Sequence, residues 1–459
     1  MYTYQDLLNV GDDERQKIEF IHNLIYSHRN SEEFKTASIA DKYNKHQNVT
    51  ISEYQKILYT VTGKVVPDNF SANFKMACRH FHRFVVQENQ FLLGNGATFD
   101  KDGIEGKLGT KKYSFDNQLQ RLGKNALIHG VSFGFFNADH LDVFSLLEFA
   151  PLYDEENGAL RAGVRFWQID KSKPLRATFY EIDGYTDIIW RNGEDYEILQ
   201  EKRPYKLSIR ESEADGVEIY DGENYPSFPI IPMWGNDEKQ SELIGIREQI
   251  DCYDLIKSGY ANTVDEASIV YWTIQNAGGM DDVDLAKFVE RIKTVHAAVI
   301  DEDGASAESH QQEAPYESRE ALLERLNQDL YRDAMALDVE QIAGGAVTAT
   351  QIKAAYEPLN SKCDEFEYCV REFIYALLEL TGLDAEVTFT RSMIVNATEE
   401  IQIVLASAQY LTSDYVTEKI LNLLGDGDQI DTMLKEMSEE DFGQFSLQQQ
   451  QPQEPEPIE

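Results

Sequence analysis

The stretch that most constrains this chain is a long helical pattern that follows a small glycine-containing loop. The pattern predicts one amphipathic helix, with Thr350 as its N-cap and Gly382 as its stop. Pro358 lies inside it, and the ring and missing N–H of a proline should kink the helix there. Gly344 and Gly345 precede it, so a mobile loop is expected to lead into a long bent helix. The apolar residues that carry the pattern are Ile352, Ala355, Leu359, Cys363, Phe366, Val370, Phe373, Leu377 and Leu380.

The charge of the chain restricts the partners that it can bind. It has 81 acidic residues against 42 lysines and arginines, which gives a formal net charge of −39. Proteins hold duplex DNA chiefly by neutralising its phosphates, so a chain this acidic is not expected to grip DNA with its whole surface. It could still form a surface past which DNA slides.

Length and cysteine content indicate the broad class of protein. The 459 residues exceed the size at which one core stops growing, so several domains are expected. We interpret the four scattered cysteines as reduced packing residues of a cytosol-made protein, because their spacing matches no standard metal site. Neither a secretion signal nor a membrane-spanning segment is expected from the apolar pattern.

The first half of the chain predicts helices followed by an antiparallel sheet. We interpret residues 1–39 as an N-terminal surface arm, and helices are expected over 73–94 and 118–128. Prolines at 226, 229 and 232 should close this domain, because prolines this close cannot continue a central strand or a helix. The runs rich in Tyr, Phe, Val and Ile that predict hairpins, with the clearest turns at Asp183-Gly184 and Asn192-Gly193, are 131–136, 143–148, 160–170, 177–182, 187–191, 197–200 and 205–211.

The second half predicts two long helices around a small α/β insert. The helices are expected to begin at Ser241 and Ser318 and to reach about residues 262 and 338. The expected parts of the insert are a strand over 269–275, a helix over 282–293, a strand over 297–301 and a loose polar stretch to 313. Beyond Gly382 we expect a strand over 386–391, then helices over 398–410, 413–424 and 429–437. Residues 446–459, rich in Gln, Pro and Glu, should be disordered.

Motifs that would indicate an enzyme are incomplete. Ser132 fits the pattern GxSxG, but that motif needs a strand before the serine and a helix after it, whereas the opposite order is predicted here. Cys78, His80 and His82 would point in different directions on the predicted helix, which favours packing or surface roles over a metal site. No carboxylate stands out from the acidic background. We therefore expect no catalytic residue, no metal and no cofactor.

Five segments follow one another in a characteristic order. They are an apolar helix ending in Leu-Gly at 84–94, a helix, glycine and aromatic strand at 126–136, a Pro-Leu-Tyr-Asp run before a strand within 147–166, the step from 229–236 into the helix at 241–262, and the loop with its long helix at 344–366. This order resembles that of the portal proteins of tailed bacteriophages, of the kind found in siphophages and related prophages. The resemblance covers about residues 40–440.

The resemblance implies a multi-region α+β fold, assembled as a ring of twelve copies around an axial DNA channel. The implied regions are a β-containing wing at 40–235, two stem helices at 236–262 and 318–338, a small α/β clip at 263–317, a tunnel loop at 339–350, a kinked spanning helix at 351–382 and a mainly helical crown at 383–445.

The resemblance also implies partners and a location. The partners are further copies of the chain, double-stranded DNA that passes without sequence specificity, the terminase large subunit, head-completion or adaptor proteins, and major capsid and scaffolding proteins. The implied location is a capsid vertex of the virion, after assembly in the cytoplasm of the bacterial host and without a membrane.

Three groups of residues are candidates for function. Small uncharged residues could form a flexible collar near the duplex or a plain helix–helix connector: Ile342, Ala343, Gly344, Gly345, Ala346, Val347 and Thr348. Basic residues of the stem helices could form rings in the channel or pair with carboxylates of neighbouring copies: Arg247, Lys257, Arg325 and Arg332. Clip aromatics could dock a partner or form a small core: Tyr271, Trp272 and Phe288.

We therefore predict a phage portal, a passive DNA conduit and docking platform that hydrolyses nothing itself. Two alternatives stay open. One is an acidic structural ring or scaffold protein of another kind. The other is a carboxylate-based hydrolase, which would require a compact monomer.

Overall fold

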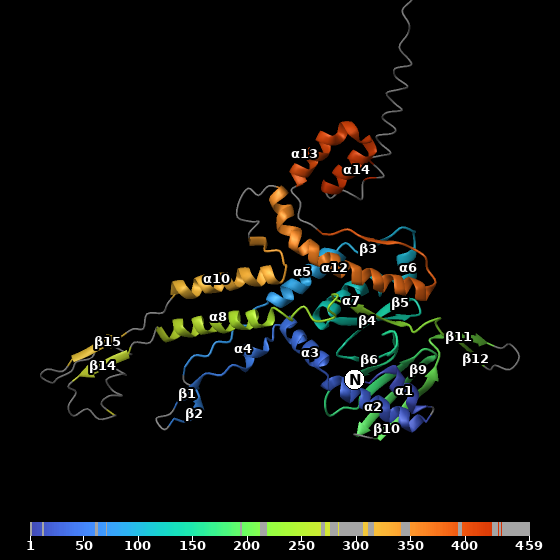
Figure 1. The fold of residues 1–459 in the computed structure, drawn as a ribbon, viewed down its shortest axis with the longest axis horizontal. Helices are drawn as coiled ribbons and strands as arrows, with labels where there is room; N and C mark the ends of the chain where they lie inside the picture. Colours follow the sequence, from blue (N-terminus) through green and yellow to red (C-terminus); the bar gives the residue numbers. More distant parts are fainter. Residues whose placement is uncertain are drawn as a thin grey trace, which may run out of the picture. The chain divides into compact units, whose positions relative to one another are not determined.

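The computed structural model describes residues 2–11, 13–59, 63–69, 71–192, 195–211, 218–267, 271–275, 283, 306–310, 316–340, 349–392, 397–424, 430 and 433. The chain divides into two compact units, Met1–Ala336 with Lys362–Thr390, and Leu337–Ser361 with Arg391–Glu459. Helices and antiparallel sheets are both present (Figure 1), so the predicted α+β class is confirmed. Among the described helices, none combines the length and apolar character that crossing a bilayer requires.

A five-stranded antiparallel sheet forms one layer of the first unit, in the order β10-β9-β8-β7-β6. The predicted hairpins are confirmed here, and Gly184 turns between β8 and β9 with a φ of +142°. Strand β6 was not predicted. The bounds are β6 (Phe149–Tyr153), β7 (Leu160–Trp167), β8 (Leu175–Glu181), β9 (Gly184–Asn192) and β10 (Asp195–Arg203).

The N-terminal helices α1 (Tyr4–Val10) and α2 (Glu14–Asn30) cover this sheet. Their apolar side chains share one core with the strands, where Ile21 and Ile25 pack in the same cluster as Val164 and Phe179. The prediction of a surface arm over 1–39 is therefore wrong for these helices. Their charged faces suggested exposure, but the apolar stripe of α2 has a sheet to cover.

A second core lies around α5 (His80–Leu93), α7 (Phe115–His129) and the three-stranded sheet β13-β4-β5. Its strands are β4 (Val131–Asn137), β5 (His140–Ser145) and β13 (Ile230–Trp234). The later part of α12 (Ala349–Thr381) packs here so closely that a Cβ on Gly134 would lie 2.6 Å from the ring of Phe373. Gly130 ends α7 with a φ of +87°, as the predicted helix-to-strand turn requires.

The proline-marked run after 226 needs a correction, because it ends in a strand. β13 pairs antiparallel with β4, with Pro232 opposite Phe133. It occupies the edge of its sheet, where a residue without an N–H is tolerated. The prediction correctly excluded a central strand but missed this edge strand.

Helices α8 (Arg247–Ala267) and α10 (Tyr316–Asp333) are the two predicted long helices. The first begins six residues later than predicted at 241, and Ser241 instead donates a hydrogen bond to the carbonyl of Ile128 at 2.6 Å. Between the helices, β14 (Tyr271–Gln275) pairs with β15 (Ser306–His310). The predicted loose stretch is therefore wrong at 306–310. The predicted strand over 297–301, and the helix over 282–293 apart from Val283, lie outside the described residues.

Smaller elements complete the first unit. They are α3 (Glu32–Asn44), α4 (Val49–Glu53), the hairpin of β1 (Ile57–Tyr59) and β2 (Val65–Pro67), α6 (Ile104–Leu108), the pair β11 (Lys206–Glu211) and β12 (Glu218–Glu223), and the pair β3 (Ala97–Phe99) and β16 (Val387–Phe389).

The second unit contains the start of α12 with α13 (Ala397–Ser407), the 3-10 turn η1 (Ala408–Tyr410) and α14 (Ser413–Leu424). Arg391 Nη1 donates to the backbone carbonyl of Asn360 at 3.2 Å, which ties the chain entering this unit to α12. Helix α12 runs through Pro358 without interruption, and the predicted kink stays a prediction. Residues 434–459, including the predicted disordered tail, lie outside the described residues.

Candidate functional site

Helices α8 and α10 pack against each other in antiparallel orientation. Near one end Gln249 donates to the carboxylate of Asp333, and near the other Arg319 Nη1 donates to Thr263 Oγ1 at 2.6 Å. The rings of Tyr260 and Tyr316 meet edge to face at the same end. Because side chains join the helices at both ends, the pair is a firm two-helix element that presents charged outer faces.

Two of the predicted channel residues share one carboxylate on α10. Arg325 Nε lies 3.0 Å from Asp329 Oδ2, and Arg332 Nη1 lies 3.0 Å from Asp329 Oδ1. The arginine side chains are 62% and 63% exposed, so these pairs contribute only a few tenths of a kcal/mol. Both guanidinium groups can therefore exchange this partner for another anion at small cost.

The other two channel candidates lie on α8. Arg247 Nε is 3.7 Å from Asp251 Oδ2, and Lys257 Nζ is 5.6 Å from the ring centroid of Tyr253. These contacts, like those of Arg325 and Arg332, come from the same helix. Basic rings in the channel and pairing with carboxylates of neighbouring copies both stay predictions.

The remaining candidates are only partly placed. Tyr271 and Trp272 lie on β14, opposite His310 and Ser309 of β15. Phe288 and the whole predicted tunnel loop, Ile342, Ala343, Gly344, Gly345, Ala346, Val347 and Thr348, lie outside the described residues.

Three polar side chains of α8 hold the backbone of an adjoining segment. They stand one helical turn apart and accept hydrogen bonds from alternate N–H groups, and we call the set the polar ladder. Its pairs are Asp254 Oδ1 with Cys78 N (2.8 Å), Ser258 Oγ with Met76 N (2.9 Å) and Asn262 Oδ1 with Phe74 N (2.7 Å). The bonds from Met76 and Cys78 take amides that a helix beginning at the predicted residue 73 would use for its own hydrogen bonds, which explains why α5 begins at His80.

Asp254 is the most enclosed member of the polar ladder, with no exposed surface. Its second oxygen accepts from Asn48 Nδ2 at 2.5 Å, so helix, ladder segment and the residue before α4 meet at one carboxylate. Burial raises the pKa of Asp254 above its ordinary value, and the hydrogen bonds from Asn48 and Cys78 oppose that rise.

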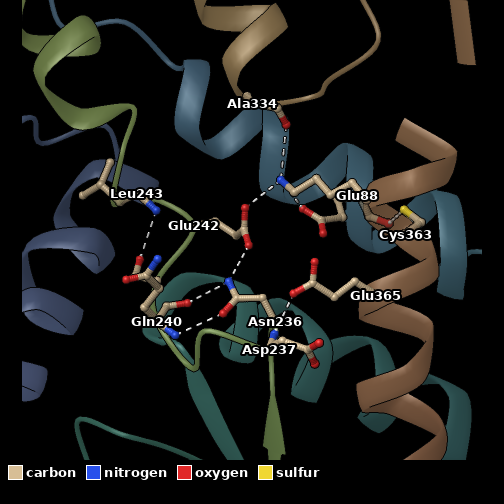
Figure 2. A network of polar contacts seen from close by, with 11 residues as sticks. Glu88, Asn236, Asp237, Gln240, Glu242, Leu243, Ala334, Cys363 and Glu365 are labelled. Atoms are coloured by element: carbon tan, nitrogen blue, oxygen red, sulfur yellow. Dashed lines mark hydrogen bonds and ion pairs between the residues drawn. The ribbon is translucent and has the colours of Figure 1, made fainter. Parts of the chain in front are cut away.

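A buried lysine, Lys362, joins four parts of the first unit, and its partners Glu88, Glu242 and Ala334 are labelled in Figure 2. Lys362 Nζ lies 2.8 Å from Glu88 Oε2 of α5 and 2.7 Å from Glu242 Oε2 in the segment before α8. It also donates to the carbonyl of Ala334, just past α10, at 3.3 Å. Lys362 itself belongs to α12. We call this set, Lys362 with Glu88, Glu242 and Ala334, the lysine junction.

Further polar contacts surround the lysine junction. Asn236 donates to Glu242 Oε1 at 2.7 Å, and Glu365, three residues after Lys362 on α12, accepts from the N–H of Asp237 at 2.7 Å. A cavity of about 220 Å³ lies beside these groups. The arrangement fixes α12 to the segment that leads into α8, and its carboxylates are engaged in holding helices.

The charges of the lysine junction do not balance, because one ammonium faces two carboxyl groups. Burial raises the pKa of Glu88 to about 7, although the charge of Lys362 opposes that rise. Burial acts to lower the pKa of Lys362, but the charges of Glu88 and Glu242 outweigh it, so the ammonium stays protonated. Uptake of one proton by Glu88 near neutral pH would make the set neutral.

A pH dependence follows from Glu88. Its folded-state pKa of about 7 lies above the ordinary value of 4.5, so the stability from this group is complete below pH 4.5 and is lost as the pH rises to about 7. We expect the wild type to lose roughly 2 kcal/mol of unfolding free energy relative to Glu88→Gln between about pH 5.5 and about pH 8. Urea unfolding of both proteins at matched pH measures this. A difference that stays constant over that range would contradict the assignment.

Sequence reasoning missed the polar ladder and the lysine junction. The sequence analysis singled out no carboxylate, whereas the structure buries two, with Glu88 2% and Asp254 0% exposed. A signal was present for Glu88, which interrupts an otherwise apolar helix face. A similar signal was present for Lys362, because it lies three residues after Leu359 and therefore near the apolar face of the predicted helix.

The residues that were set aside as catalytic or metal-binding have structural contacts. Ser132 is buried on β4 and donates to the carbonyl of Phe144 at 3.1 Å. His80 contacts Asn327, whereas His82 contacts Asn44, so the two rings serve different elements. Within the described residues, no three side chains of the metal-binding types gather at one point.

Comparison with known proteins identifies the family. A family model described as phage portal protein, SPP1 Gp6-like, matches residues 23–442. The portal protein of Clostridium phage phiCD119 is 25% identical over 275 residues, which cover 57% of this chain and 58% of that protein, less than two thirds of its length. The portal protein of Bacillus phage SPP1 is 24% identical over 389 residues, which cover 77% of this chain and 73% of that protein.

Among solved structures, a chain from the neck of an empty gene transfer agent particle covers 76% of this chain and 90% of its own length, with 11% identity and a TM-score of 0.47. That likeness is too weak to support the assignment, which rests on the family model. The family model spans most of the chain, which confirms the resemblance seen in the order of the sequence segments. The chain therefore belongs to the phage portal proteins of the SPP1 Gp6-like family.

Proposed function

We propose that this chain is the subunit of a twelve-membered ring at one capsid vertex, through which double-stranded DNA passes during packaging and ejection. The family match over 23–442 is the observation that carries the proposal. The ring would assemble in the cytoplasm of the bacterial host and remain in the virion. It would dock the terminase large subunit first, and head-completion or adaptor proteins afterwards, beside the major capsid and scaffolding proteins.

The antiparallel pair of α8 and α10 suits the stem of such a ring. Residues 236–262 and 318–338 would form the stem, 263–317 the clip, 40–235 the wing, 339–350 the tunnel loop, 351–382 the spanning helix and 383–445 the crown. Firm side-chain links between the two helices support a wall element that keeps its shape under load.

The charge of the chain supports passive transport. A wall drawn from subunits of net charge −39 would repel DNA phosphates, so the duplex would meet little friction. Arg325 and Arg332, held only by surface pairs to Asp329, could contact passing phosphates or carboxylates of a neighbouring subunit. No chemical reaction is proposed for the chain, since its family is a structural one.

Negative-stain electron microscopy of the purified protein tests the proposal. We expect uniform rings with a central hole. A protein that stays monomeric at all concentrations would overturn the ring and would favour the carboxylate-based hydrolase. Rings without a hole would favour an acidic scaffold of another kind.

A further inference from the structure

The hairpin of β1 and β2 exposes apolar side chains on both strands. Register pairs Tyr59 with Val65 and Leu58 with Val66. Alternation along the strands places Ile57, Tyr59 and Val65 on one face, where they are 51%, 72% and 56% exposed. We call these three residues the hairpin face. Leu58 and Val66, on the opposite face, are 41% and 37% exposed.

Such a hairpin is poorly stabilised by its own chain. Every described residue of both strands is exposed, and the two strands form a sheet of their own. An isolated two-stranded hairpin is marginally stable in water and usually needs a third strand or a helix to pack against. Contiguous apolar patches on soluble proteins mark contact surfaces. The hairpin face is therefore a surface to be covered.

The base of the hairpin is nevertheless held, because one backbone bond joins its two strands and the segment that follows is bound to α4 and α8. The N–H of Asp68 donates to the carbonyl of Lys56 at 2.9 Å, and Lys75 Nζ donates to the carbonyl of Ser52 at 2.5 Å. The polar ladder then holds the segment that follows, while the side chains of Phe74 and Met76 remain 52% and 39% exposed. A fixed base limits the conformational entropy that docking would cost.

The hairpin region differs in charge from the rest of the chain. Between residues 54 and 79 lie four of the 42 basic residues, Lys56, Lys64, Lys75 and Arg79, but only one of the 81 acidic ones, Asp68, which gives a net charge of +3. The remainder of the chain is strongly acidic. A second copy therefore offers the complementary charge that steers association and selects a partner.

We propose that the hairpin face docks onto a neighbouring copy of this chain. The inference rests on the proposed ring and adds the surface through which one subunit reaches the next. Exposed aliphatic and aromatic side chains with basic residues near them in the sequence fit an acidic protein surface. Duplex DNA would match the charge alone, because its phosphates do not cover apolar groups.

A photo-crosslinking amino acid in place of Tyr59 tests the contact directly. We expect irradiated rings to give denatured bands at multiples of 52.5 kDa, with the crosslink mapped to a second copy. The same probe in place of Ile169, which is 89% exposed in the β7–β8 connection, is the control and should give few such bands. Crosslinks confined to one chain, to DNA or to another protein would overturn the inference.

A substitution pair provides the second measurement. Tyr59→Thr with Val65→Thr keeps strand-forming residues but removes the apolar contact, and should reduce ring yield at equal concentration at least about tenfold. Ile169→Thr should leave the yield unchanged. Equal thermal unfolding of the monomeric forms shows that the variants fold. If the wild type forms no rings, the proposed function fails; if the wild type and the double variant form rings equally, only the hairpin inference fails.

Discussion

Replacing Lys362 by methionine is expected to lower the free energy of unfolding by about 3–5 kcal/mol. The substitution keeps most of the side-chain volume but leaves Glu88 and Glu242 facing each other without a cation, in a place where Glu88 is 2% exposed. Removing one partner of a buried ion pair costs more than the pair itself contributes, because the remaining carboxyl groups must either stay charged and desolvated or take up a proton. The carbonyl of Ala334 also loses its donor.

Arg371→Met on the same helix is the matched control. Arg371 Nη2 lies 2.8 Å from Glu367, but the pair is partly exposed and spaced i,i+4, so its loss should cost about 0.5 kcal/mol or less. Urea unfolding followed by circular dichroism, at a concentration where all variants share one oligomeric state, compares them. Adding Glu88→Gln to Lys362→Met should restore part of the stability. Equal losses for Lys362→Met and Arg371→Met would show that the lysine junction is not a stabilising element.

Asp254→Ala should release the segment along α8 and cost about 2–4 kcal/mol of unfolding free energy. The carboxylate accepts from Cys78 N and Asn48 Nδ2, and alanine would leave the Cys78 N–H buried without an acceptor and Asn48 Nδ2 with only its bond to the carbonyl of Cys78 at 3.3 Å. Because Asp254 is the innermost contact of the polar ladder, its loss should also free the base of the β1–β2 hairpin. The effect therefore combines a global loss of stability with local opening.

Limited trypsin digestion separates the two parts of that effect. Cleavage after Lys75 and Arg79 in the folded protein should be at least about tenfold faster in Asp254→Ala than in the wild type, since cleavage follows local opening. Asp254→Asn keeps one acceptor oxygen and should lie between them. Ser258→Ala, which removes one neutral contact of the same ladder, should have a smaller effect. Unchanged cleavage in Asp254→Ala would mean that the segment is held by other contacts.

Patterns confined to neighbouring residues predicted much of the fold. The apolar stripe of α12, the hairpins of the five-stranded sheet and the turn at Gly130 depend on residues a few positions apart, and periodicity identifies them. The starts of α5 and α8 were misplaced because residues distant in sequence decide them. The backbone amides that would extend α5 are hydrogen-bonded to side chains of α8.

The candidate sites also divide into contacts between near neighbours in the sequence and contacts between residues far apart in it. Pairs such as Arg325 with Asp329 follow from i,i+4 spacing, so a helix prediction already implies them. Lys362 and Glu88 are 274 residues apart, and composition in a chain with 81 acidic residues cannot single out one buried carboxylate. The apolar surroundings of Glu88 were the available signal, and they indicate burial without naming the partner.

The polar ladder also sets a limit on its own length. Four residues of a helix advance about 6.0 Å, whereas two residues of an extended chain advance about 6.6 Å. The two spacings differ by roughly 0.6 Å at each contact, so they match over Asp254, Ser258 and Asn262 but would no longer match a few contacts further on. The ladder can therefore extend over only a short stretch of both segments. An insertion of a single residue between two of these contacts, in either partner, would therefore put the contacts beyond it out of register.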